Sequence, residues 1–188
     1  MATHTQIALE EYLDNEASAL FRSEYRAGEV VAMSGASPKH DLIITRLTVL
    51  LYACLKQRGC NLFTKDVLVH VPECEAVYYP DFFVVCGKLK QLKRKRGASA
   101  ILNPAVVIEV LSDSTRSYDQ QAKFACYKTL PSLQQYVLLH QDTVKAEVYD
   151  QQKNWQVDEV TDANADLTVM GCKITLKDIY EAVDPETE

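Results

Sequence analysis

The sequence lacks three features that would assign it to a class at once: a long apolar run, an excess of basic charge and a paired-cysteine motif. No stretch of about 18 uninterrupted apolar residues is present, so we expect no membrane-spanning segment and no membrane partner. Residues 1–16 are polar and acidic, without the basic start and apolar stretch of a secretion signal. The net charge of −6 excludes a global positive field for nucleic acid.

The cysteines are scattered, and none belongs to a CxxC motif or a Cys/His cluster. They are Cys54, Cys60, Cys74, Cys86, Cys126 and Cys172. Several lie in apolar stretches, where a free thiol behaves as a small core residue. We therefore expect neither a disulfide framework nor a structural zinc site. A reducing cytoplasm is the compartment that this cysteine usage predicts.

The composition is that of an ordinary globular protein. Its 188 residues are 47% hydrophobic and 24% charged, which predicts one domain over 1–188 with a sizeable core and an N-terminal helical arm at 1–20. Apolar spacing predicts helices at 7–16, 37–59, 116–130 and 176–182. Strands are predicted at 21–26, 29–34, 61–64, 67–71, 77–85, 105–111, 135–139, 145–149 and 155–160. This order predicts an α/β fold with a mixed sheet flanked by helices.

Two carboxylates interrupt apolar strand candidates. Asp81 lies within 77–85, and Glu109 lies within 105–111, a run so apolar that it predicts a central strand covered on both faces. An ionised carboxylate in such a place is costly unless it is paired or bound to a metal. Oxygen ligands suit Mg²⁺ or Mn²⁺. The alternative is that each carboxylate pairs with a separate arginine or lysine for structural reasons.

Four further residues are candidates for the same site. Asp119 and Lys123 are spaced i, i+4 on the helix at 116–130, so Lys123 can reach back toward the carboxylates and neutralise charge on a phosphate; the pair is also compatible with an ordinary surface helix. His40 lies on the buried face of the helix at 37–59, where it is either a site residue or a hydrogen-bonded core residue. Glu29 is a weaker candidate, which is also compatible with a plain surface carboxylate.

Two surface features bear on partners. The basic run at 88–96 is either a solvated loop or a phosphate-contacting finger, with Lys93, Arg94, Lys95 and Arg96 as its candidate nucleic-acid contacts. The apolar strands at 136–139 and 144–149 offer an edge to a second copy, and a homodimer is also what cleavage of two DNA strands would favour. We therefore expect a homodimer.

Several motifs, in this order, resemble one known family. They are Glu24-Tyr25-Arg26-Ala27-Gly28-Glu29, Pro38-Lys39-His40, Tyr79-Pro80-Asp81, Pro104 to Glu109-Val110-Leu111-Ser112 with Thr115, and then Asp119, Lys123 and Tyr127. Together they resemble the Uma-two family of restriction endonucleases, which is abundant in cyanobacteria and belongs to the PD-(D/E)xK nuclease superfamily. The resemblance covers residues 7 to 182, nearly the whole chain.

The resemblance implies a core sheet flanked by helices and a metal site. Asp81 and Glu109 would be the metal ligands, with the main-chain carbonyl of Val110 as a further ligand. The superfamily's lysine stands two residues after the glutamate, where this sequence has Leu111. The family pattern implies that this lysine has moved to the following helix, as Lys123.

The function implied is a metal-dependent endonuclease that hydrolyses phosphodiester bonds in DNA with Mg²⁺ or Mn²⁺. Lys123 would position or activate the attacking water, with His40 and Asp119 in support and Glu29 as a weaker contributor. The alternative is a catalytically inactive module that keeps the nuclease fold and binds nucleic acid or protein. The missing strand lysine and the acidic composition favour this alternative.

Overall fold

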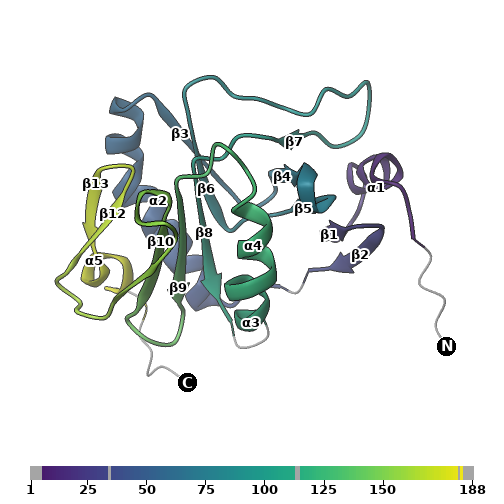
Figure 1. Cartoon of the computed structure of the whole chain (residues 1–188). Helices are drawn as coiled ribbons and strands as arrows, with labels where there is room; N and C mark the ends of the chain where they lie inside the picture. Colours follow the sequence, from purple (N-terminus) through teal and green to yellow (C-terminus); the bar gives the residue numbers. More distant parts are fainter. Residues whose placement is uncertain (1–5, 34, 113–114, 182, 184–188) are drawn as a thin grey trace.

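The computed structural model describes residues 6–33, 35–112, 115–181 and 183. The larger sheet has the strand order β11-β10-β9-β8-β6-β3 (Figure 1). Its strands are β3 (Cys60–Thr64), β6 (Phe82–Cys86), β8 (Val106–Leu111), β9 (Gln135–His140), β10 (Ala146–Asp150) and β11 (Val157–Val160). The smaller sheet has the order β2-β1-β5-β4-β7. Its strands are β1 (Ser23–Arg26), β2 (Glu29–Ala32), β4 (Leu68–Val71), β5 (Ala76–Tyr78) and β7 (Ala100–Ile101).

The remaining elements are helices, helical turns and one hairpin. The hairpin strands are β12 (Asp166–Val169) and β13 (Cys172–Thr175). The helices are α1 (Leu9–Glu16), α2 (Pro38–Gln57), α3 (Arg116–Tyr118), α4 (Phe124–Tyr127) and α5 (Leu176–Tyr180). The helical turns are η1 (Pro72–Cys74), η2 (Asp119–Lys123) and η3 (Gln151–Lys153), of which η2 is π-helical.

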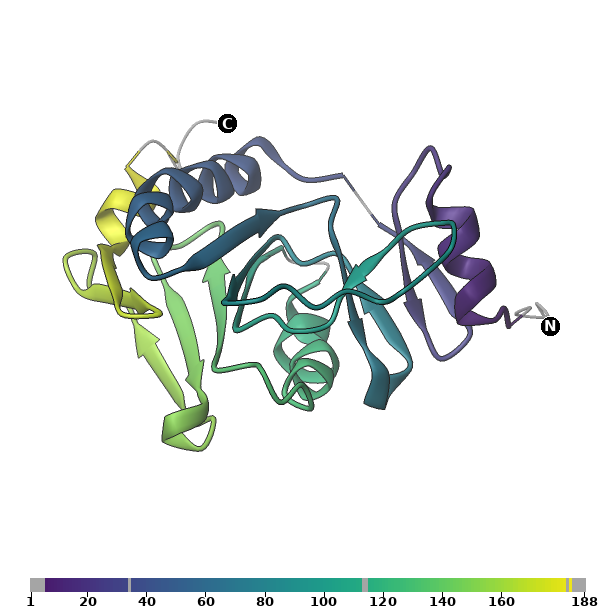
Figure 2. The ribbon, with the colours of Figure 1, turned by 90° about the horizontal axis from the view of Figure 1, so that it is seen from above.

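Helices cover both faces of the larger sheet. Helices α2 and α5 and the β12–β13 hairpin share one hydrophobic core with one face of this sheet. The α3–η2–α4 segment and the smaller sheet close a second core on the opposite face (Figure 1). Helix α1 packs on the smaller sheet in a third cluster. Figure 2 shows α1 and the β1–β2 hairpin at one end of the molecule and the β12–β13 hairpin at the other. The predicted α/β class, with a mixed sheet flanked by helices, is confirmed, and the smaller sheet is an addition to it.

The two elements that matter most for the site follow the sequence pattern closely. Helix α2 begins where Ser37 and Pro38 predicted, and the Ser37 hydroxyl caps it by accepting the backbone N–H of His40 at 3.1 Å. Strand β8 is buried at all six positions and lies between β6, to which it is antiparallel, and β9, to which it is parallel. Its alternate side chains enter the two cores, and Glu109 lies on the same face as Val107 and Leu111, which belong to the second core.

The strand predicted at 77–85 is two strands in two sheets. Strand β5 ends at Tyr78, and β6 begins at Phe82. Pro80 stands between them and has no backbone N–H to donate to a ladder, so the chain leaves one sheet and enters the other at this point. Asp81 therefore lies just before β6, not inside a strand. The helix predicted at 116–130 also differs, because its middle turn is π-helical and α4 ends at Tyr127.

The strand edge predicted for pairing with a second copy is not free. Strand β9 lies between β8 and β10, and β10 lies between β9 and β11. Both strands therefore have their hydrogen-bonding partners within the chain. The prediction was wrong because β9 is buried throughout inside the larger sheet and both edges of β10 are already paired.

The cysteine prediction was also wrong, because all six cysteines are paired. The disulfides are Cys54–Cys172, between α2 and β13, Cys60–Cys86, between β3 and β6, and Cys74–Cys126, between η1 and α4. Their sequence separations of 118, 26 and 52 residues explain the failure, since spacing along the chain does not show which thiols meet in space. The expected reducing cytoplasm rested on free thiols and loses that support.

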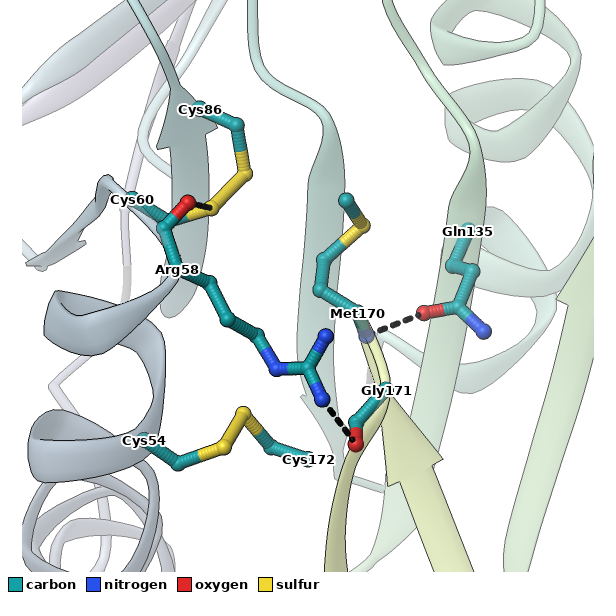
Figure 3. Close-up of a disulfide and its surroundings, with 8 residues drawn as sticks. All are labelled: Cys54, Arg58, Cys60, Cys86, Gln135, Met170, Gly171 and Cys172. Atoms are coloured by element: carbon teal, nitrogen blue, oxygen red, sulfur yellow. Dashed lines mark hydrogen bonds between the residues drawn. A yellow bond between two sulfur atoms is a disulfide. The ribbon is translucent and has the colours of Figure 1, made fainter.

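Two of the disulfides lie close together at one end of the larger sheet. Figure 3 shows the Arg58 side chain extending from the end of α2 between Cys60–Cys86 and Cys54–Cys172. Its Nη2 donates to the carbonyl of Gly171 at 3.0 Å. The hairpin β12–β13 is thus attached to α2 by both a disulfide and a hydrogen bond. Among the described residues, no helix combines the length and apolar character needed to cross a membrane.

Candidate functional site

Asp81 lies where helix α2 and strand β8 approach the start of β6. Its Oδ2 accepts the backbone N–H of Val110 at 2.8 Å. Its Oδ1 is 3.0 Å from Nε2 of His40 in the first turn of α2. The side chains of His40 and Asp81 are 12% and 17% exposed, so this end of the site is the part that solvent reaches.

Glu109 lies beside Asp81 and is more deeply buried. Its Oε2 accepts the backbone N–H of Asp81 at 3.3 Å. Its Oε1 is 3.0 Å from Nζ of Lys123, at ion-pair distance but without hydrogen-bond geometry. The side chain of Glu109 is only 3% exposed. The structure therefore brings together the two carboxylates that interrupt the apolar runs, at the junction of β6 and β8.

Lys123 reaches this pair from the π-helical turn η2. Its ammonium lies 3.0 Å from Glu109, 3.1 Å from Glu24 and 3.8 Å from Asp119. A π-helical turn is wider than an α-helical turn, and such turns are frequent at functional sites. Here Asp119 and Lys123, at the two ends of η2, are both buried, with Nζ of Lys123 3.8 Å from Oδ1 of Asp119. Leu111, two residues after Glu109 on the same face of β8, is fully buried in the second core.

Glu24 is the site residue that the sequence analysis missed. It lies in β1, and its side chain is 8% exposed. Within the sequence it sits among polar neighbours, so no burial signal singles it out; only its place in the family motif could have done so. Glu29, which the sequence analysis did name, is exposed and not buried like Glu24. It lies exposed on the edge strand β2, and no hydrogen bond or ion pair joins its side chain to another described residue.

The electrostatics of the cluster are dominated by burial and by one ammonium. Burial raises the pKa of Glu109 well above its ordinary value, and Lys123 offsets only part of this effect. Burial likewise raises the pKa of Asp119. For Lys123, burial alone would lower the pKa, but the carboxylates of Glu109, Glu24 and Asp119 raise it well above the ordinary value. Lys123 is therefore charged at neutral pH.

The donor set fits a hydrated divalent cation. The Lys123 ammonium lies against three carboxylates, those of Glu24, Glu109 and Asp119, and Glu109 in turn accepts the backbone N–H of Asp81. Over the described residues, no group of three or more His, Cys, Asp or Glu side chains forms a ready metal-ligand set. Asp81 and Glu109 supply two adjacent carboxylates. Two protein ligands are enough for Mg²⁺, which usually keeps several of its waters, whereas Zn²⁺ in a structural site takes four protein ligands.

The basic run lies away from this cluster and is partly engaged elsewhere. The Arg94 side chain is 5% exposed, with Nη1 3.0 Å from Glu10 and Nη2 against Asp14, both on α1. Arg96 also pairs with Asp14 at 3.0 Å. Arg94 and Arg96 therefore attach the 87–99 loop to α1. Lys93 and Lys95 are exposed and remain candidates for phosphate contact.

Substitution Arg94→Ala is expected to lower the free energy of unfolding by about 2 kcal/mol, because it removes the partly buried charged hydrogen bond to Asp14 and the bond to the main-chain carbonyl of Glu10, which hold the loop. Urea unfolding measures this change. Lys95→Ala, on the same loop, is the control and should leave the urea midpoint unchanged. Equal midpoints for the two variants would show that Arg94 does not anchor the loop.

Comparison with known proteins gives the chain a family. Residues 9–176 match the family Uma2, described as "Putative restriction endonuclease". Two uncharacterized proteins of Synechocystis sp. are relatives. The protein sll1609 is 31% identical over 176 residues, which cover 93% of this chain and 98% of that protein. The protein slr1290 is 31% identical over 148 residues, which cover 79% of this chain and 76% of that protein.

The fold also has a solved counterpart. A crystal structure of "a putative nuclease belonging to DUF820" from Anabaena variabilis ATCC 29413 matches with a TM-score of 0.76. The match covers 94% of this chain and 99% of that one, at 19% sequence identity. At this identity the likeness shows a shared fold, while the family follows from the sequence. The chain belongs to the Uma2 family.

Proposed function

We propose that this protein is a metal-dependent endonuclease that hydrolyses phosphodiester bonds in DNA. The observation that carries the proposal is the meeting of Asp81, Glu109 and Lys123, which come from three separate segments of the chain. Buried carboxylates held against one lysine are the residue types that a phosphodiester-hydrolysing metal site needs. Membership of a family described as "Putative restriction endonuclease" supports the same reaction class.

In this proposal Asp81 and Glu109 hold Mg²⁺ or Mn²⁺, and the main-chain carbonyl of Val110 is a further ligand. The bound metal would supply a water of lowered pKa and stabilise charge on the scissile phosphate. The chain's own residues then do the positioning. The backbone N–H of Val110 fixes Oδ2 of Asp81, and His40 lies against Oδ1. The Lys123 ammonium, beside Glu109, orients the water and neutralises the phosphate.

A second candidate function is a nuclease-fold module that binds without cutting. The observation that favours it is the enclosure of Lys123, whose ammonium is surrounded by three carboxylates and buried. Leu111 in place of the strand lysine points the same way. This candidate predicts binding without turnover, and no loss of that binding when Asp81 is changed to Asn.

The test combines metal binding with cleavage. Wild type, Asp81→Asn and Glu109→Gln are titrated with Mn²⁺ by calorimetry, and the same samples are assayed on supercoiled plasmid. We expect both variants to lose metal binding, because each removes one of two adjacent carboxylates, and we expect nicking by wild type alone. Asp166→Asn, a carboxylate of the β12–β13 hairpin paired with Lys173, is the charge-matched control and should bind and nick like wild type.

The outcomes separate the candidates. Metal binding by wild type without nicking under broad conditions would favour the non-catalytic module. Absence of metal binding by wild type would assign structural roles to Asp81 and Glu109 and remove the basis of the nuclease proposal. Retained nicking in both variants would place the reaction elsewhere in the molecule.

A further inference from the structure

Four charged side chains of alternating sign form a row across the site. Nη2 of Arg26 is 3.2 Å from Oε2 of Glu24. Oε1 of Glu24 is 3.1 Å from Nζ of Lys123, and the same Nζ is 3.0 Å from Glu109. The row joins the smaller sheet, through β1, to the larger sheet, through β8. The Lys123 ammonium is therefore shared almost equally between two carboxylates, only one of which belongs to the proposed metal pair.

Glu24 is held in place from two sides. Its Oε1 accepts the backbone N–H of Tyr79 at 3.4 Å, and its Oε2 accepts from Arg26. The Arg26 guanidinium in turn lies 3.6 Å over the ring of Tyr118, whose hydroxyl donates to that of Tyr78 at 3.1 Å. A carboxylate fixed in this way is a preorganised counter-ion for Lys123.

We infer that Glu24 is the positioning residue that keeps the Lys123 ammonium in the site when the Glu109 carboxylate binds a divalent cation. The inference rests on the proposed function. A cation at Asp81 and Glu109 and the Lys123 ammonium compete for the same Glu109 carboxylate, and they repel each other at such short range. Glu24 gives the ammonium a second partner at nearly the same distance, so the cation and the lysine can occupy the site together. Without Glu24 the remaining neighbour is Asp119 at 3.8 Å.

The inference makes Glu24 act through Lys123, and this distinguishes it from two other roles. If Glu24 were a direct metal ligand, its substitution would weaken metal binding whether or not Lys123 is present. If Glu24 only stabilised the fold, its substitution would lower the free energy of unfolding but leave the metal affinity unchanged. A double-mutant cycle between the two positions separates these roles.

The experiment has two arms, each with wild type, Glu24→Gln, Lys123→Met and the double variant. The first arm measures urea unfolding without metal, where the direct ion pair predicts that the two substitutions are coupled by about tenfold or more in the unfolding equilibrium constant. The second arm measures Mn²⁺ affinity by calorimetry. We expect Glu24→Gln to weaken Mn²⁺ binding about tenfold when Lys123 is present, and less than about threefold in the Lys123→Met background.

A matched control removes a buried carboxylate that does not touch the row. Glu16 is 2% exposed and accepts hydrogen bonds from Ser23 and Tyr79, so Glu16→Gln tests the loss of one buried negative charge near β1. It should change unfolding but leave Mn²⁺ affinity as in wild type. If Lys123→Met does not fold, Lys123→Gln provides the second background, because it removes the charge and keeps a hydrogen-bond donor.

Each outcome either supports or overturns the role inferred for Glu24. Weaker Mn²⁺ binding by Glu24→Gln that depends on the presence of Lys123 supports the inference. Equal weakening by Glu24→Gln in both backgrounds makes Glu24 a metal ligand, and no weakening in either makes it purely structural; both overturn the inference while leaving the proposed metal site intact. A wild type that binds no Mn²⁺ overturns the metal site and, with it, this role for Glu24, and the first arm still shows whether the two residues are paired.

Discussion

Replacing Lys123 with methionine is expected to lower the free energy of unfolding by about 3–5 kcal/mol, because it leaves buried carboxylates without their shared counter-ion. The ammonium is 3.0 Å from Glu109 and 3.1 Å from Glu24, and all three side chains are less than 10% exposed. Methionine matches the length of the lysine stem, so the change removes charge with little loss of packing. Urea unfolding at neutral pH measures the effect.

Two comparisons make this expectation specific to the buried charge. Lys128→Met, an exposed lysine at the end of α4, should leave the urea midpoint nearly unchanged. Adding Glu109→Gln to Lys123→Met should recover part of the loss, because it removes one of the carboxylates left unpaired. A Lys123→Met protein as stable as wild type would contradict the picture of a cluster neutralised by this lysine.

Replacing Cys54 and Cys172 with serine is expected to lower the free energy of unfolding by about 4 kcal/mol, since their disulfide closes the longest loop in the chain. The two cysteines are separated by 118 residues, and the bond joins α2 to β13. An unfolded chain without it gains conformational freedom in the parts of that loop that the other two disulfides, both within it, leave unrestrained. Thermal or urea unfolding of the oxidised double variant, compared with oxidised wild type, measures the loss.

The same reasoning predicts a rank order for the three disulfides. Removal of Cys74–Cys126, with a separation of 52, should cost less, and removal of Cys60–Cys86, with a separation of 26, should cost least. Mass spectrometry of the unreduced, thiol-blocked protein shows whether the bonds are present. Six blocked thiols in a sample never exposed to reductant would refute the pairing outright.

Much of the architecture is local enough to be predicted from the sequence. The serine cap and proline before α2, and the apolar run of β8, each specify an element through neighbouring residues alone. The split between β5 and β6 could not be predicted in the same way, because both halves are apolar and only Pro80 marks the break. The cysteine pairs depend on tertiary proximity, which no local pattern encodes.

In the candidate site, too, some residues could be predicted from local sequence and others could not. Asp81 and Glu109 stood out because a charge in an apolar strand requires a compensating partner, and the structure places them together with Lys123 and His40. Glu24 did not stand out, because its burial depends on a helix encoded far along the chain. Glu29 has the same residue type and a similar local setting but faces solvent. Local sequence cannot tell these two glutamates apart.

The site draws its side chains from β1, α2, the start of β6, β8 and η2, which are five segments spread over much of the chain. Contacts of such high sequence separation form late and slowly, because loop closure must precede them. During synthesis, a chain that has emerged only as far as β8 already contains Glu24, His40, Asp81 and Glu109 but has no Lys123 to neutralise them. The assembled charge cluster therefore requires the chain through η2, and a truncated product ending before η2 has no means of forming it.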